Sequence, residues 1–473
     1  MLETRCQISA MNNKIDIKKA GFYYLIGTLF NKGIAFITVP IFTRILSTED
    51  YGIVTTYNSW VAIASMVTSL ALYAAIRTGF VDYESKVNDV LSALTNFILL
   101  YGSCMTLFVL IGVYILPFSV DIALVAFCMV QSVAYGIVEN LSMYFMMKYR
   151  YKIRTVILVL PNLLSTIIAV LLIKFVLQEK LYFGRIVPNA SINLLFGIYA
   201  LIYIFKHSRI RFSKEYLEYG LKISIPLVLH GISLNILSQS DRAMITMLRD
   251  ASETGIYGLI YNFSMIATVF TTALDGIWVP YFTEKMKVGD YDGLNSFSKK
   301  YIKLMALIIL GVILLAPEIV KLMAPVVYWE GIRIIPPIVL SNYIIFLYTL
   351  YVNIEYYHKK TFFIMINTSI AALSNIILNL IFIKLFGYVG AAYTTILSYL
   401  ISLGLHYAYA RKLNNKLFTG KTVILPSLCL AAIVVVFYIF IDKWTVRWGI
   451  AALCTIYMLL AEKEFILNIV RRR

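Results

Sequence analysis

Long, uninterrupted runs of apolar residues constrain the fold of this chain more than any other feature of its sequence. Residues 157–176 and 425–441 are two of these runs. About 20 residues of α-helix cross the hydrocarbon layer of a bilayer, and a helix satisfies its backbone hydrogen bonds internally. Strands of a membrane barrel would instead alternate polar and apolar residues over about 10 positions. The sequence therefore predicts an all-α integral membrane protein.

The composition agrees with lipid as the natural surroundings of the chain. Hydrophobic residues make up 60% of the sequence and charged residues 14%, whereas a soluble domain carries about 25% charged residues. The net charge of +17 can indicate a nucleic-acid partner. The basic residues fall in short gaps between apolar runs, however, and this placement is typical of membrane topology. We therefore expect membrane lipids, and no nucleic acid, as partners.

We predict about fourteen membrane-spanning helices, joined by gaps too short to hold a separate soluble domain. The predicted spans are 20–45, 51–77, 88–116, 119–147, 153–177, 182–205, 216–248, 255–283, 298–323, 332–357, 361–385, 388–410, 420–441 and 444–462. A basic linker at 206–215 separates the first six helices from the remaining eight.

The distribution of Lys and Arg predicts the orientation of these helices. If the amino terminus is cytoplasmic, the inner gaps hold 30 basic residues and the outer gaps hold ten. Cytoplasmic loops carry such an excess of Lys and Arg. We therefore expect both termini on the cytoplasmic side, while Met1 and Met11 both remain candidates for the native start.

A weak internal repeat links the turns that follow the first and the seventh predicted helix. Residues 47–58 and 251–262 share Glu, Tyr and Asn at a constant offset of 204, with glycines nearby. Six predicted helices lie between the two turns, so the repeats have the same topology. Parallel repeats of this kind build some transporters from two lobes around a central site.

Several short motifs add a family resemblance to this picture. They are Asn31-Lys-Gly, Val39-Pro-Ile-Phe-Thr-Arg-Ile-Leu-Ser-Thr-Glu-Asp-Tyr-Gly-Ile53, Gln239-Ser-Asp-Arg242 and Gly255-Ile-Tyr-Gly258. Together with the fourteen-helix layout, they resemble polysaccharide flippases of the Wzx type. These flippases belong to the multidrug/oligosaccharidyl-lipid/polysaccharide exporter superfamily.

The resemblance implies two six-helix lobes around a central cavity, followed by two further helices. The implied parts are a cytoplasmic lead-in (1–19), an N-lobe (20–205), a cytoplasmic linker (206–215), a C-lobe (216–410), and two last helices with a basic tail (411–473). It also implies a substrate, an oligosaccharide repeat unit linked to undecaprenyl diphosphate. The chain would move this unit by alternating access from the cytoplasmic to the periplasmic leaflet of the bacterial inner membrane, for O-antigen, lipopolysaccharide or capsule synthesis.

Three basic residues are candidates for binding the anionic headgroup. Lys32 and Arg242 lie within predicted spans, and Arg77 lies at the cytoplasmic end of the second. A charge inside the membrane is unfavourable by a few kcal/mol and seldom persists without a cavity or partner. Arg can also bind phosphate oxygens in pairs. The alternatives are that Lys32 pairs with an intramembrane acid, that Arg242 pairs with Asp241, and that Arg77 extends to the interface.

Three acidic residues within predicted spans are candidates for coupling to a proton or sodium ion. They are Glu139, Asp241 and Asp275. Each could instead be a structural partner for a buried cation. A fourth acid, Glu355, precedes His358-Lys359-Lys360, and we expect it at the membrane interface.

Other functions remain open at this stage. A multidrug or cation exporter of the same fold is the nearest alternative, although Lys32 and Arg242 argue against a cation-attracting cavity. A membrane polysaccharide polymerase or glycosyltransferase would need a large outer loop or an acidic cytoplasmic motif, and the sequence has neither. The five cysteines and four histidines match no metal-binding spacing. The sequence therefore predicts a transporter without a cofactor or catalytic residues.

Overall fold

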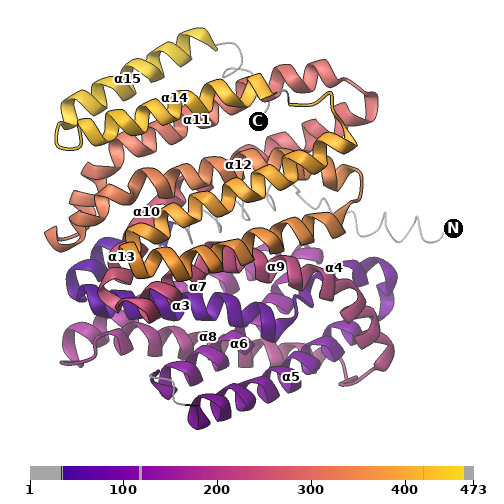
Figure 1. Cartoon of the computed structure of the whole chain (residues 1–473). Helices are drawn as coiled ribbons and strands as arrows, with labels where there is room; N and C mark the ends of the chain where they lie inside the picture. Colours follow the sequence, from indigo (N-terminus) through magenta and orange to yellow (C-terminus); the bar gives the residue numbers. More distant parts are fainter. Residues whose placement is uncertain (1–32, 35, 117–119, 419, 463–473) are drawn as a thin grey trace. The chain divides into compact units, whose positions relative to one another are not determined.

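Helices account for all the regular structure in the described part of the chain. The structure is a computed structural model that describes residues 33–34, 36–116, 120–418 and 420–462. Within these ranges every regular element is helical (Figure 1). Lys32 lies outside the described residues. The predicted all-α class is therefore confirmed.

Twelve helices in the described ranges are long and apolar enough to cross a membrane. One of them, α13 (Thr361–Leu413), contains a non-helical residue at Gly387 and is two helices joined at that point. A shorter apolar helix, Phe36–Ile45, precedes these twelve. The helix count therefore agrees with the prediction of about fourteen spans, and the chain is a multi-pass integral membrane protein.

The described chain forms two compact units. The first unit contains residues up to Ile41 and Trp60–Val228, and the second contains Phe42–Ser59 and the chain from Leu229 onward. The helices α3 (Thr48–Ser69) and α9 (Lys214–Leu248) each contribute to both units. The division into lobes at 206–215 stays a prediction.

The first unit is built from five helices around an apolar core. They are α4 (Tyr73–Asp82), α5 (Val87–Ile115), α6 (Ile122–Met147), α7 (Tyr151–Phe175) and α8 (Tyr182–His207). The core lies where α4, α5, α6 and α8 meet, and its fully buried residues include Leu94, Ile98 and Leu141. Because lipid tails are as apolar as these side chains, close van der Waals packing rather than removal from water stabilises this core. The short helix η1 (Glu84–Lys86) joins α4 to α5.

The second unit contains the remaining helices. They are α10 (Ala251–Val288), α11 (Tyr291–Met323), η2 (Val326–Ile334), α12 (Ile335–Tyr357), α13, α14 (Gly420–Ile439) and α15 (Trp444–Ala461). The helices α12 and α13 pack against each other, and α14 and α15 lie against α11 (Figure 1).

The second predicted span, 51–77, is not one continuous helix. Leu70 and Ala71 have φ values of 47° and 48°, in the left-handed region, and they separate α3 from α4. Such residues are unfavourable in that region by about 1–2 kcal/mol each. The Ala71 amide donates to the Ser69 hydroxyl, and Gly136 of α6 lets Ser69 approach closely. These tertiary contacts hold a break that no Gly or Pro marks in the sequence.

The two repeated turns contact each other inside the second unit. The Ser252 hydroxyl donates to the Thr48 hydroxyl at 2.6 Å, and these positions are separated by the repeat offset. A Cβ on Gly52 would lie 1.6 Å from the Ala251 carbonyl oxygen, and one on Gly255 would lie 2.2 Å from the Thr48 carbonyl oxygen. The first turns of α3 and α10 therefore meet backbone to backbone, which only glycine permits.

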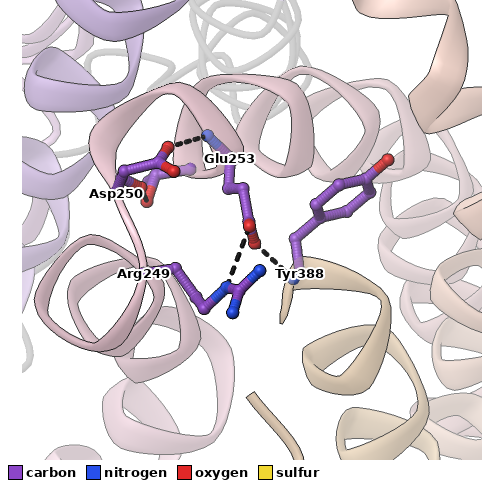
Figure 2. Close-up of polar contacts among 5 residues, drawn as sticks. Arg249, Asp250, Glu253 and Tyr388 are labelled. Carbon is purple, nitrogen blue, oxygen red and sulfur yellow. Dashed lines mark hydrogen bonds and ion pairs between the residues drawn. The ribbon is translucent and has the colours of Figure 1, made fainter. Parts of the chain in front are cut away.

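A cluster of charged residues fixes the ends of three helices in the same unit (Figure 2). Gly387 has φ of 60° and breaks α13, and the amide of Tyr388 donates to Glu253 Oε2 at 2.9 Å. Arg249, at the end of α9, donates to Glu253 Oε1 at 3.0 Å. Asp250 caps α10 by accepting from the Glu253 amide. A carboxylate at a helix N-terminus satisfies free amides there.

We predict that Gly52→Ala destabilises the protein by about 1–3 kcal/mol, because the added methyl group has no space and α3 must move away from α10. The measurement is thermal unfolding of the purified protein in detergent. Gly311→Ala in α11 is the matched control, since nothing lies within 4 Å of its added Cβ. Equal stability of the two variants would contradict this packing.

Candidate functional site

Asp241 of α9 is a fully buried acid at the centre of a polar cluster. Its carboxylate is 0% exposed. Its Oδ2 accepts hydrogen bonds from the hydroxyl of Tyr257 in α10 and, at 3.1 Å, from the hydroxyl of Thr395 in α13. Its Oδ1 has no hydrogen-bond partner among the described residues. The three helices that supply this cluster are the ones joined by Glu253.

A row of buried amides and hydroxyls lies on the same helices. The Thr394 hydroxyl donates to Asn379 Oδ1, and Asn379 Nδ2 donates to Asn375 Oδ1 at 3.1 Å. The Ser240 hydroxyl also donates to Asn375 Oδ1, at 3.1 Å. Asn375 and Asn379 are both 0% exposed. The row places carboxylate, amide and hydroxyl oxygens in the interior of a membrane-spanning unit, and such oxygens suit a proton or a hard cation.

Arg242 is buried beside this cluster and makes its contacts elsewhere. Its guanidinium lies 3.8 Å from the centre of the Tyr261 ring. Its Nη1 donates to the Ser238 carbonyl at 2.7 Å and to Gln239 Oε1 at 2.5 Å. Only 3% of the residue is exposed. Arg242 is therefore covered by Tyr261 in this conformation, while its charge acts on Asp241 electrostatically.

The first unit carries two of the predicted charged residues on neighbouring helices. Glu139 of α6 has an exposed tip, although protein atoms enclose much of it. It interacts electrostatically with Tyr73 of α4. Arg77 is exposed one helical turn further along α4, on the same face as Tyr73. A charged carboxylate is unfavourable against hydrocarbon by a few kcal/mol, so we expect this face of α4 and α6 to border water.

Asp275 of α10 is half-buried and stands next to two tyrosines. Its Oδ1 has no hydrogen-bond partner in the described ranges. Tyr301 of α11 and Tyr348 of α12 both interact with it electrostatically. No described hydrogen bond connects Asp275 with Asp241, so the two predicted coupling acids of this unit occupy separate positions.

Glu355 is buried between helices near the end of α12, and its place at the membrane interface stays a prediction. Glu355 is 0% exposed and accepts hydrogen bonds from Nδ1 of His406 at 3.0 and 3.1 Å. Its position on α12 turns it toward α13 rather than toward the basic residues that follow it. Sequence spacing did not connect Glu355 with His406, because the two lie on different helices.

Comparison with solved structures establishes the class of fold. The chain is similar to the lipid II flippase MurJ in an inward closed conformation, with a TM-score of 0.65 and 17% identity over 93% of this chain and 99% of the other. It is also similar to an inward-facing multidrug resistance MATE family transporter of the MOP superfamily. That match has a TM-score of 0.60 and 14% identity, over 84% of this chain and 98% of the other. The fold is thus the multi-helix membrane fold shared by these proteins.

Sequence comparison gives the family. The profile of the family described as "Polysaccharide biosynthesis protein" matches residues 17–286, which is more than half of the chain. The chain therefore belongs to this family, and the resemblance seen in its motifs is confirmed.

Two relatives from Haemophilus influenzae also match. The "Lsg locus putative protein 1" is 24% identical over 58% of this chain and 67% of its own length. An "Uncharacterized membrane protein" is 23% identical over 73% of this chain and 85% of its own length.

We predict that the thiol of Glu139→Cys reacts with a charged, membrane-impermeant reagent about tenfold faster than the thiol of Leu100→Cys. The reason is that the reactive thiolate forms only in contact with water. Leu100 is 57% exposed on α5 but apolar, and serves as the lipid-facing control. The measurement is labelling kinetics in inside-out vesicles, in a chain whose five cysteines are replaced. Equal rates would show that the Glu139 face does not border water.

Proposed function

We propose that this chain is a flippase for a lipid-linked oligosaccharide in the synthesis of a surface polysaccharide. The observation that carries the proposal is its membership of the polysaccharide biosynthesis family combined with the fold of a lipid II flippase. The exposed charges of Glu139 and Arg77 within a membrane-spanning unit support a translocation path. We place the chain in the bacterial inner membrane with both termini cytoplasmic. The oligosaccharide unit that it moves is linked to undecaprenyl diphosphate.

The headgroup of such a carrier is a diphosphate, which basic residues recognise. Arg77 is exposed on α4 in the first unit and is suited to a first encounter with the anion. Arg242 is covered by Tyr261, so binding at Arg242 requires that ring to move. Charge-assisted hydrogen bonds to phosphate stabilise a complex by about 1.5–3 kcal/mol each. Lys32, Arg77 and Arg242 are thus proposed to act at successive stages of transport.

We predict that Lys32→Ala, Arg77→Ala and Arg242→Ala each lower polysaccharide export about tenfold, since each removes about 1.4 kcal/mol or more of headgroup binding. The measurement is surface polysaccharide relative to membrane-inserted protein in a strain that lacks the native gene. Lys214→Ala is the control, because the Lys214 side chain is 83% exposed and pairs with Glu218 along the helix surface. Normal export in all three variants would exclude the headgroup role.

We further propose that Asp241 binds the coupling ion, a sodium ion or a proton. A buried carboxylate oxygen without a hydrogen-bond partner is unfavourable, and the guanidinium of Arg242 donates to Ser238 and Gln239 rather than to this oxygen. The Thr395 hydroxyl adds a further oxygen atom beside the same carboxylate. The ion would stabilise the conformation in which α9, α10 and α13 remain packed around Asp241. Glu139 and Asp275 are further candidates for this role.

We predict that sodium ions raise the thermal stability of the purified protein, by about 2.7 kcal/mol at a concentration of about 100 times Kd. Asp241→Asn is expected to abolish this stabilisation. Asp250→Asn is the control, because Asp250 is an exposed helix cap. Two results together would identify the ion as a proton. The wild type would not respond to sodium but would be more stable at acidic than at neutral pH, and Asp241→Asn would lose this pH dependence. A response retained in Asp241→Asn would exclude this site.

A second candidate function is the export of organic cations. The exposed carboxylate of Glu139 and the likeness to a multidrug transporter favour it. The two functions separate in the export strain, since a drug exporter changes drug sensitivity and leaves surface polysaccharide unaltered.

A further inference from the structure

A groove with a volume of about 480 Å³ lies between α7 and α8 on an exposed face of the first unit. Its apolar and aromatic walls are formed by Ile153, Val156, Ile157, Leu195, Phe196 and Tyr199. Further along α7 the exposed side chains are also apolar, among them Leu163, Ile167 and Leu171. An apolar surface along membrane-spanning helices faces lipid rather than water. The groove is therefore open to the bilayer.

Positive charge gathers at one end of this groove. Lys152 lines the groove directly, and the ion pairs of the described residues do not include it. Lys148 and Arg150 are exposed in the turn that precedes α7. This turn is closed by the Arg150 amide, which donates to the Phe145 carbonyl at 2.9 Å. We call Lys148, Arg150 and Lys152 the basic rim.

Aromatic packing places the basic rim beside α8 as well as at the start of α7. The ring of Phe145 lies 5.1 Å from the ring of Tyr203, which is one helical turn from Tyr199 of the groove. The Lys148 ammonium lies 4.5 Å from the centre of the Tyr144 ring, next to Phe145. The end of α6 and the turn after it are thus packed against α8 near the groove.

The two helices that form the groove carry no acidic residue. Residues 140–178, which include the turn and α7, contain no Asp or Glu, and neither do residues 180–214, which include α8. A matching ligand is apolar along its length and negative at one end. Anionic phospholipids have this form, and basic pockets between membrane helices bind their headgroups. Phospholipids also far outnumber any carrier lipid in the bilayer to which the groove opens.

We propose that the groove between α7 and α8 binds an anionic phospholipid, with its headgroup on the basic rim and an acyl chain between Val156 and Leu195. Each Lys or Arg near the membrane surface strengthens the binding of an anionic lipid about fivefold. A neutral lipid fits the same walls but gains nothing from the rim. The site does not depend on the proposed transport function, because a phospholipid can occupy it without any transport substrate.

The test is photo-cross-linking of the full chain in phosphatidylcholine nanodiscs. The ligand is phosphatidylglycerol with a diazirine on its acyl chain, added below saturation, and mass spectrometry locates the cross-links. We expect cross-links to the groove walls on α7 and α8, and we expect Lys152→Gln to lower their yield about fivefold. Lys152→Arg should retain them. Lys152 is exposed, so these variants are expected to fold.

Two controls separate local binding from general attraction to the chain. Lys174→Gln removes the same charge from the exposed opposite end of α7, about 33 Å away, and should leave the yield unchanged. A second apolar groove of about 350 Å³, lined by Leu107 and Ile198 among others, has no charged residue in its walls. Its cross-links should be the same in every variant.

Equal yields in the wild type and Lys152→Gln would overturn the proposal, and so would an equal loss in Lys174→Gln. Competition identifies the occupant: unlabelled phosphatidylglycerol is expected to displace the ligand at a concentration at least fivefold lower than phosphatidylethanolamine. Equal competition by the two lipids would contradict anionic selectivity. A polyprenyl phosphate that competes at a lower concentration than phosphatidylglycerol would assign the groove to a carrier lipid and overturn the proposal. None of these measurements uses polysaccharide export, so failure of the flippase proposal would appear separately.

Discussion

The absence of water around a buried charge is the constraint on which this structure depends. In a membrane-spanning unit each carboxylate needs hydrogen-bond donors, a cation or contact with an aqueous path. Asp241 has two hydroxyl donors and an oxygen left over, Glu355 has an imidazole, and Glu253 has an arginine and a helix amide. Of these three carboxylates, Glu253 is the one that accepts a hydrogen bond from an arginine. Asp241 keeps one oxygen without a donor among the described residues, and this is why we connect it with an ion rather than with stability.

The contacts around Glu253 connect the charge of Asp241 with the packing of three helices. Asp241, Tyr257 and Thr395 come from the three helices whose ends meet at Arg249, Glu253 and Tyr388. A change of charge at Asp241 alters the forces between helices whose ends are joined about one to two turns away. The joined ends of α9, α10 and α13 can then stay in place while the rest of each helix moves.

Much of the fold could be predicted from sequence, because lipid fixes the length and polarity of every span. The site was predicted less completely. Asp241 was identified because an acid in an apolar run is rare, but its partners Tyr257 and Thr395 were indistinguishable from other hydroxyl-bearing residues. The burial of Glu355 against His406 was not predicted, since the rotation of a helix depends on its neighbours and not on the residues beside it in sequence. The break at Leu70 was missed for the same reason.

The hydrogen bond between Thr48 and Ser252 joins two positions separated by the repeat offset. A glycine lies close to each position and brings the backbone of one turn against the backbone of the other. A contact between equivalent positions has the form of an isologous interface, in which one patch meets its own copy. A substitution that widens one turn would therefore disturb both repeated segments at once.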